Sequence, residues 1–396
     1  MPSLPFGVYV HFPWCRRRCP YCDFAVEVAI EPPHQAYLEA VLGELAEQAP
    51  SFGGRQLVSI YFGGGTPSLW SVDCVAAVIR AVRERWAASG PLEITMEANP
   101  TDCQPERVEA WRAAGVNRVS VGVQSTRAEE LAVLGRDHRM GDGVAAIARL
   151  QAAGELRVSA DFIVGVPRRG PRGGRALPML APAELAVGDG AAAAADLGWV
   201  DVLARSLAQH ASVYELTVED GAAFSKRVAD GRLIPPPADD LAELYVAVHH
   251  ALAARGFEHY EISSFARPGF RAVHNSLYWS GGEFLGLGVG AASYRRTEGG
   301  AVRWSNRRRF ALYQRERLAE RRDISPLEDA GDRLWLGLRT SDGVRALDLA
   351  ERPGVTEWLL GDGLAELVDG NVVPTVRGFL FADAIAARIV GAAGGR

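Results

Sequence analysis

Lysine is nearly missing from this chain of 396 residues, in which Lys226 is the only one. Arginine therefore supplies almost all of the basic side chains, and the net charge is only −5. So small an excess of negative charge gives no overall attraction to nucleic acid or to an anionic membrane surface. Because alanine and glycine are abundant as well, we attribute the arginine content to a GC-rich coding bias and not to phosphate binding.

Long hydrophobic runs and cysteines are also scarce. No stretch reaches the roughly 18 uncharged apolar residues that suggest a membrane-spanning helix. Residues 1–14 lack the basic start, the apolar core and the small-residue cleavage site of a signal peptide. The five cysteines are an odd number, which does not suit a disulfide framework. We therefore expect a protein of the reducing cytoplasm without a transmembrane segment.

Strand-like and helix-like segments alternate through the first half of the chain. We expect strands at 7–12, 57–62, 92–97, 118–123, 157–164 and 212–218, and helices at 35–48, 71–86, 105–114, 127–134, 142–153 and 201–209. This order predicts an α/β fold in which helices cover a parallel sheet. Because six strands are too few for an eight-stranded barrel, we predict a partial (β/α)6 barrel.

The chain is too long for one ordinary core, so we expect further parts after the barrel. The barrel is expected over residues 1–234, an extension of it over 235–306, and a smaller, mostly helical α+β domain of winged-helix type over 307–396. The acidic balance favours a packing role for that last domain over DNA binding. Residues 168–198 are rich in Gly, Pro and Ala and are expected to form a long loop, either a neutral insertion or a lid over the site.

Three cysteines lie close together after the first expected strand, at Cys15, Cys19 and Cys22. Their thiolates are soft ligands that suit an iron–sulfur cluster or zinc. A structural zinc site takes four ligands, usually from two separated pairs, and this chain has no second pair of cysteines. A [4Fe–4S] cluster held by three cysteines leaves one iron free to bind a small molecule. The spacing C-x3-C-x2-C therefore favours the cluster over zinc.

The residues around these cysteines resemble a known family. The runs YVHFPWC at 9–15 and CPYCDF at 19–24 are similar to the radical S-adenosylmethionine (SAM) group of oxygen-independent coproporphyrinogen III oxidases, and most similar to its heme-chaperone branch, the HemW-like proteins. The resemblance implies that the free iron chelates the amino and carboxylate groups of SAM. It also implies that the reduced cluster cleaves SAM to a 5′-deoxyadenosyl radical.

Glycines and polar side chains stand at the ends of several expected strands. The glycine-rich run 63–67 follows the second strand, and Glu97 and Gln124 end the third and fourth. Taken singly, each could be a helix cap or a surface residue, but their shared position favours one site. The resemblance implies cofactor contacts for Tyr9, Phe24, Gly64, Gly65, Thr66, Glu97, Gln124, Arg136, Asp161 and Ala292. At Ala292 the branch commonly has histidine, so the contact made there is in doubt.

Two places distinguish the oxidases from the chaperone branch. The oxidases carry a further cysteine two residues after the third one, where this chain has Phe24, whose ring can neither ligate metal nor donate a hydrogen atom. The run HNSLYW at 274–279 matches the H-N-x-x-Y-W motif of the heme-binding branch. A histidine can ligate heme iron and aromatic rings can contact a porphyrin, although a histidine packed among core aromatics is the alternative. The expected heme-binding residues are His274, Asn275, Tyr278 and Trp279.

Three functions compete at this point. The first is a chaperone that binds a [4Fe–4S] cluster, SAM and heme and hands the heme to recipient proteins. The second is an enzyme that converts coproporphyrinogen III to protoporphyrinogen IX without oxygen, which Phe24 disfavours. The third is a metal-stabilised binding module without radical chemistry. The resemblance favours the first, and it is compatible with respiratory heme proteins as recipients, peripheral contact with a membrane and a homodimer.

Overall fold

The computed structural model describes residues 4–86, 88, 90–170, 197–218 and 222–393. It confirms the α/β class, because its largest feature is a twelve-stranded sheet in the order β11-β12-β9-β7-β6-β5-β4-β1-β13-β14-β15-β16. The central strands are parallel and comprise β1 (Pro5–Phe12), β4 (Gln56–Gly64), β5 (Glu93–Ala98), β6 (Arg118–Gln124), β7 (Arg157–Val164), β9 (His210–Glu215) and β13 (Glu283–Leu287). The first six of these are the predicted barrel strands.

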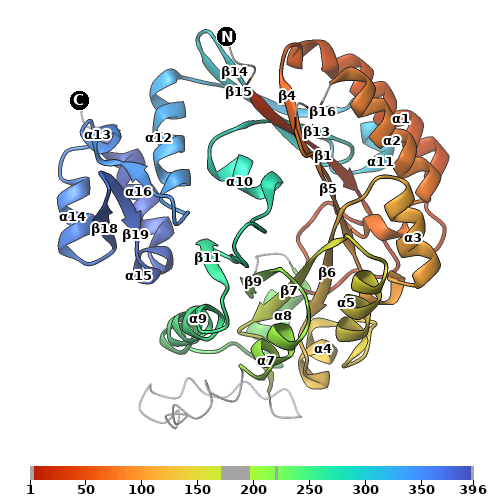
Figure 1. The fold of residues 1–396 in the computed structure, drawn as a ribbon, viewed down its shortest axis with the longest axis horizontal. Helices are drawn as coiled ribbons and strands as arrows, with labels where there is room; N and C mark the ends of the chain where they lie inside the picture. Colours follow the sequence, from red (N-terminus) through yellow and green to blue (C-terminus); the bar gives the residue numbers. More distant parts are fainter. Residues whose placement is uncertain (1–3, 87, 89, 171–196, 219–221, 394–396) are drawn as a thin grey trace.

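Helices cover the outer face of the parallel strands (Figure 1). They are α1 (His34–Gln48), α2 (Val72–Arg85), α3 (Pro105–Ala113), α4 (Ala128–Leu134), α5 (Asp142–Ala152) and α7 (Gly198–Arg205). The alternation along β1 shows why this face is buried, since Phe6, Val8 and Val10 are fully enclosed in the main hydrophobic core. The residues between them point to the opposite, inner face, which carries polar side chains.

The inner face is closed at one end by α10 (Val273–Trp279). Figure 1 shows this helix on the side of β1 and β4 that faces away from α1 and α2. It packs against both strands and is followed by β13, which pairs in parallel with β1. The sheet therefore has a seventh parallel strand that the alternating pattern did not predict.

Antiparallel strands extend the sheet at both edges. One edge holds β12 (Ser264–Ala266) and β11 (Glu258–Glu261), and the other holds β14 (Ala292–Thr297), β15 (Gly300–Asn306) and β16 (Leu318–Ile324). The sheet continues past residue 307, because β16 pairs with β15. All of its residues except Ile324 are exposed, as expected of a charged edge strand.

The C-terminal unit has its own hydrophobic core, formed by residues such as Leu338, Leu359 and Ile389. Its elements are α12 (Pro326–Gly337), β17 (Val344–Arg345), α13 (Ala346–Leu349), α14 (Val355–Gly361), β18 (Ala365–Val368), β19 (Asn371–Pro374), α15 (Val376–Leu380) and α16 (Ala382–Ala393). The three strands form a separate antiparallel sheet, so this unit is α+β as predicted.

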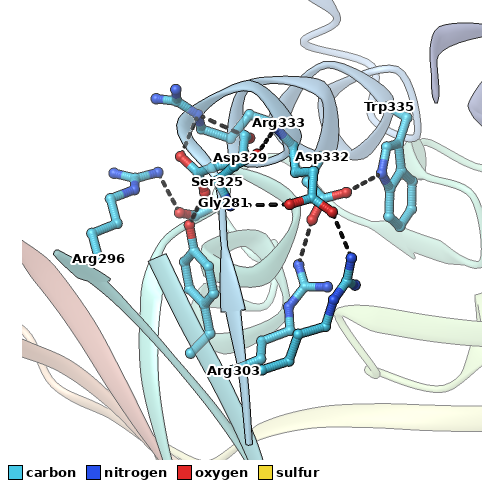
Figure 2. Close-up of polar contacts among 11 residues, drawn as sticks. Gly281, Arg296, Arg303, Ser325, Asp329, Asp332, Arg333 and Trp335 are labelled. Atoms are coloured by element: carbon cyan, nitrogen blue, oxygen red, sulfur yellow. Dashed lines mark hydrogen bonds and ion pairs between the residues drawn. The ribbon is translucent and has the colours of Figure 1, made fainter. Parts of the chain in front are cut away.

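Polar contacts attach α12 to the edge of the large sheet, as Figure 2 shows. The guanidinium of Arg303 on β15 donates to Asp332 at 2.8 Å, and the hydroxyl of Tyr294 on β14 donates to Asp329. These two contacts join the C-terminal unit to the large sheet. Beside them, Arg296 on β14 donates to the carbonyl of Gly281 at 2.6 Å, within the larger unit.

The remaining elements connect these parts, and all of them except α9, which has 16 residues, are short. They are β2 (Trp14–Cys15), β3 (Glu27–Val28), β8 (Arg168–Arg169), β10 (Leu233–Ile234), α8 (Ala223–Ala229), α9 (Ala238–Ala253), α11 (Phe310–Tyr313) and the 3-10 turns Ala49–Phe52, Pro67–Leu69 and Pro100–Asp102. Most of the predicted loop at 168–198 lies outside the described residues. Among the described helices, none has the length and apolar content that crossing a bilayer requires.

Candidate functional site

A cavity of about 560 Å³ opens where the central parallel strands end. Because these strands run in one direction, their carboxyl ends meet at one edge of the sheet and carry their terminal side chains to the same place. The expected site residues that line the cavity are Cys15, Cys19, Cys22, Phe24, Gly64, Gly65, Thr66, Glu97, Gln124, Arg136 and Asp161.

The three cysteines occupy the segment that follows β1 on one wall of this cavity. All three are free thiols and half-buried. The hydroxyl of Thr66 donates to the sulfur of Cys15 at 3.3 Å, and the guanidinium of Arg136 lies 3.6 Å from the sulfur of Cys19. Both donors would stabilise thiolates, which are the ligand form of cysteine.

The thiols supply the soft ligands that an iron–sulfur cluster needs. Cys15, Cys19 and Cys22 all line the same cavity. Burial raises the pKa of Cys15 to about 11, and the hydrogen bond from Thr66 opposes this shift. Three cysteines would hold three irons of a [4Fe–4S] cluster and leave the fourth iron without a protein ligand.

Two glycines let the end of β4 approach the cysteine segment closely. Gly64 has φ of +113°, and a Cβ atom there would lie 2.6 Å from the ring of His11. A Cβ atom on Gly65 would lie 2.8 Å from the carbonyl oxygen of Trp14. The amide of Gly65 donates to the carbonyl of Phe12 at 2.8 Å. Glycine at both positions is therefore needed for the end of β4 to pack this closely against the segment that carries the cysteines.

Glu97 reaches the cavity from β5 and is held by two donors. It accepts hydrogen bonds from the hydroxyl of Tyr61 at 2.8 Å and from the amide of Gly64 at 3.1 Å. Burial raises its pKa to about 7; the hydrogen bond from Tyr61 opposes this shift, and the nearby charge of Asp161 adds to it. The carboxylate is therefore poised to accept a cationic or hydroxyl donor near neutral pH.

Asp161, Gln124 and Arg136 complete the polar wall. Asp161 accepts from the hydroxyl of Ser120 at 2.9 Å, and burial raises its pKa. Gln124 has φ of +65°, which is strained for a residue other than glycine, and it stands where the pairing of β6 with β7 shifts register. Arg136 donates to the side chain of Asn99, which fixes its charge at the cavity wall.

The prediction from sequence missed several lining residues, among them Tyr61, Asn99, Tyr214 and the arginines at 16–18. Tyr61 could have been found, because it precedes Gly63 by two residues on a strand and therefore faces the same side. The arginines lie between the cysteines in a loop whose path the sequence does not specify.

Tyr9 and Ala292 do not line the cavity. The hydroxyl of Tyr9 is 3.0 Å from Nδ1 of His11, whose Nε2 is 2.9 Å from the carbonyl oxygen of Ala25. Tyr9 thus contacts the cysteine segment only indirectly, because His11 lies between its hydroxyl and the carbonyl of Ala25. Ala292 is exposed at the start of β14, opposite Ser305 on β15.

The H-N-x-x-Y-W motif forms α10 on the inner face, directly behind Tyr61, and its residues do not line the cavity. His274 is only 1% exposed, and its ring stacks on Tyr61 with centroids 5.0 Å apart. Its Nδ1 lies 2.8 Å from the hydroxyl of Ser59, and its Nε2 lies 2.7 Å from the hydroxyl of Tyr278. Both ring nitrogens are therefore engaged within the protein, and burial lowers the pKa of His274 to about 3. Asn275, Tyr278 and Trp279 are half-buried on the same helix.

Comparison with known proteins identifies the family. The profile of the Radical SAM superfamily matches residues 9–171. The chain is 34% identical to the heme chaperone HemW of Mycobacterium tuberculosis (strain H37Rv), over 99% of this chain and 96% of that protein. The chain belongs to the HemW family of radical SAM proteins. The resemblance stated from the cysteine motif is thus confirmed, and membership of the radical SAM family implies a [4Fe–4S] cluster and SAM as cofactors.

Other relatives agree with HemW membership. The heme chaperone HemW of Escherichia coli K12 is 33% identical, over 72% of this chain and 69% of that protein. Among solved structures, the coproporphyrinogen III oxidase HemN of Escherichia coli aligns with a TM-score of 0.76, covering 98% of this chain and 91% of that chain. Its sequence identity is 20%, so this likeness shows the shared fold.

Proposed function

We propose that this HemW-family protein is a heme chaperone that binds heme and transfers it to recipient heme proteins. The observation that carries the proposal is Phe24, whose side chain is 64% exposed on the cavity wall beside the cysteines. A phenyl ring cannot replace the thiol expected at this position in an oxidase. It does offer an apolar face to a porphyrin.

The proposal assigns the cavity to the radical SAM cofactors. Cys15, Cys19 and Cys22 would hold a [4Fe–4S] cluster, which together with SAM supplies a 5′-deoxyadenosyl radical on one-electron reduction. The backbone at 64–66 would lie along SAM, and Glu97 would accept a hydrogen bond from its ammonium or ribose. Arg136 is suited to pair with the carboxylate of SAM, since a guanidinium can donate two parallel hydrogen bonds. The cavity wall would keep water from the reacting groups.

The proposal for heme itself rests on the HemW relatives, whose names describe heme chaperones. It includes respiratory heme proteins as recipients, peripheral contact with the membrane that carries them, a cytoplasmic location and a homodimer. The motif residues His274, Asn275, Tyr278 and Trp279 are the heme site expected from sequence. Iron ligation by His274 would require one ring nitrogen to give up its hydrogen bond, to Ser59 or to Tyr278, while the other nitrogen could keep its partner.

A second candidate is the anaerobic conversion of coproporphyrinogen III to protoporphyrinogen IX. The fold shared with HemN favours it, and Phe24 disfavours it because no thiol is available at that position.

An anaerobic titration of the cluster-loaded protein with ferric heme, followed at the Soret band, tests the proposal. We expect saturable binding of one heme per chain. The absence of saturable binding would contradict the chaperone function. Turnover of coproporphyrinogen III with SAM and a reductant would establish the second candidate instead.

A further inference from the structure

A stack of aromatic rings leads from α10 to the cavity. The ring of His274 meets the ring of Tyr278 edge to face, with centroids 4.8 Å apart, and stacks on Tyr61 with centroids 5.0 Å apart. Of these three described rings, that of Tyr61 alone also lines the cavity. One side chain on β4 therefore touches both the H-N-x-x-Y-W motif and the space assigned to SAM.

The hydroxyl of Tyr61 holds one oxygen of Glu97. It donates to Oε1 of Glu97 at 2.8 Å, while the amide of Gly64 donates to Oε2 at 3.1 Å. Burial raises the pKa of Glu97, and the hydrogen bond from Tyr61 is the strongest influence that lowers it. Tyr61 therefore favours the carboxylate, which is the form of Glu97 that can accept the ammonium of SAM.

Other ionisable side chains lie near Glu97 on four further strands of the barrel. They are Tyr9 on β1, Arg118 on β6, Asp161 on β7 and Tyr214 on β9. Tyr9 also lies beside His274, with ring centroids 6.4 Å apart, but its hydroxyl is 3.0 Å from Nδ1 of His11. Tyr61 thus combines ring contact with α10 and a hydrogen bond to Glu97.

Little free space surrounds this contact. A Cβ atom on Gly63 would lie 2.9 Å from the ring of Tyr61 and 3.1 Å from Oε1 of Glu97. Close-packed side chains transmit a displacement to their neighbours because there is no void to absorb it. A change in the position of the His274 ring should therefore reach Tyr61 and, through its hydroxyl, Glu97.

Binding of a ligand at His274 requires such a displacement. The side chain is only 1% exposed, and the hydroxyl of Tyr278 lies 2.7 Å from its Nε2. This nitrogen becomes available only after the imidazole or Tyr278 has moved, while Nδ1 keeps its contact with Ser59 at 2.8 Å. A shifted imidazole supports the ring of Tyr61 less well, so the hydrogen bond to Glu97 weakens.

We propose that Tyr61 is a positioning residue that couples two sites, so that heme at the α10 motif and SAM in the cavity each weaken the binding of the other. The two effects must be equal in size, because a coupling free energy between two sites is reciprocal. Binding of SAM to the heme-loaded protein would then favour release of heme to a recipient. This inference rests on the proposed chaperone function and specifies how its heme site is regulated.

Two titrations of the cluster-loaded protein measure the coupling. Equilibrium dialysis gives the affinity for SAM with and without bound ferric heme, and a titration followed at the Soret band gives the affinity for heme with and without saturating SAM. We expect each ligand to weaken binding of the other by at least about fivefold, the lower end of typical coupling between sites. In Tyr61→Phe, which keeps the ring and loses the hydroxyl, this factor should fall below about twofold.

Tyr313→Phe is the matched control. The hydroxyl of Tyr313 also donates to a buried carboxylate, that of Glu44 at 2.5 Å, and neither residue lines the cavity. This variant loses the same kind of hydrogen bond and should keep the coupling of the wild type.

The pH profile of SAM binding separates positioning from packing. Loss of the hydrogen bond from Tyr61 should raise the pKa of Glu97, so the midpoint of the profile in Tyr61→Phe should lie at higher pH than in the wild type. The affinity for SAM should recover above that midpoint. A variant that is merely less well packed would bind SAM more weakly at every pH.

Iron and sulfide content and circular dichroism, measured for each variant, show whether the cluster and the fold are intact. A wild type that binds no heme contradicts the chaperone function itself. A wild type that binds heme and SAM independently, or binds one more tightly in the presence of the other, overturns only the coupling. Wild-type coupling in Tyr61→Phe, or an unchanged pH midpoint, overturns the role of Tyr61.

Discussion

The cysteine segment and α10 both carry residue types that bind metals or heme, yet they differ in what the protein leaves free. The thiols of Cys15, Cys19 and Cys22 line an open cavity, and Phe24 beside them is exposed. On α10, His274 uses both ring nitrogens in hydrogen bonds to Ser59 and Tyr278. The comparison teaches that residues of ligand type differ in how readily they can bind, because the cysteine sulfurs face an open cavity whereas both ring nitrogens of His274 are enclosed.

Among the substitutions considered, replacement of Cys15 by serine is expected to have the largest effect, and it acts on the cluster content of the protein. The cluster should be lost, because a serine hydroxyl does not supply the soft thiolate that iron–sulfur clusters require. Iron and sulfide analysis after anaerobic reconstitution measures this loss. Cys74→Ala is the matched control, since Cys74 is buried on α2 away from the cavity. A cluster retained at full occupancy in Cys15→Ser would break the assignment.

Replacement of His274 by alanine should destabilise the fold by about 2–4 kcal/mol, because it opens a cavity and leaves Ser59 and Tyr278 without their buried partner. Urea unfolding, monitored by circular dichroism, measures the change. His250→Ala on the exposed side of α9 should change stability by less than about 0.5 kcal/mol. Unchanged stability in His274→Ala, together with lost heme binding, would instead make His274 a ligand.

Protonation of Glu97 should make the affinity for SAM depend on pH. Its pKa of about 7 means that the protonated form dominates below neutrality, and that form cannot pair with the ammonium of SAM. The affinity for SAM should therefore rise as the pH increases toward 7, by up to about tenfold per unit, and level off above it. Equilibrium dialysis of SAM between pH 5.5 and 8 tests this slope. A slope that survives unchanged in Glu97→Gln would assign the titration to another group.

Ala292→His is expected to have the smallest effect. Because Ala292 is exposed and does not line the cavity, the added imidazole should shift neither SAM affinity by more than about twofold nor stability by more than about 0.5 kcal/mol. Isothermal titration with SAM and urea unfolding measure the two quantities. A marked gain in SAM affinity would show that this edge of the sheet reaches the cofactors.

The alternating hydrophobic pattern was enough to predict six of the parallel strands, because each is a local run with a distinct period. It did not predict β13, whose partner β1 lies far away in sequence, so no local signal marks the pairing. It also did not place β16 in the sheet, because this edge strand is exposed along nearly its whole length and lacks a buried face.

The sequence was sufficient to predict the site residues that lie at strand ends or within a motif. Glu97 and Gln124 follow from the rule that parallel strands end together, and the cysteines follow from their spacing. The enclosure of His274 could not be predicted, because it depends on Ser59 and Glu93 from two distant strands. The exposure of Phe24 likewise depends on how the loop folds after the third cysteine.

The position of β1 has a consequence for synthesis on the ribosome. This strand precedes every other strand of the sheet in the chain, yet it lies in the middle of the sheet between β4 and β13. One side of it can pair once residue 64 has emerged, but the other side waits until residue 287. The nascent barrel must therefore persist as an open half-sheet, with its first strand unpaired on one side, while more than half of the chain is still being made. The surroundings of the cysteine segment are thus completed only after β13 has been made, although the segment directly follows β1.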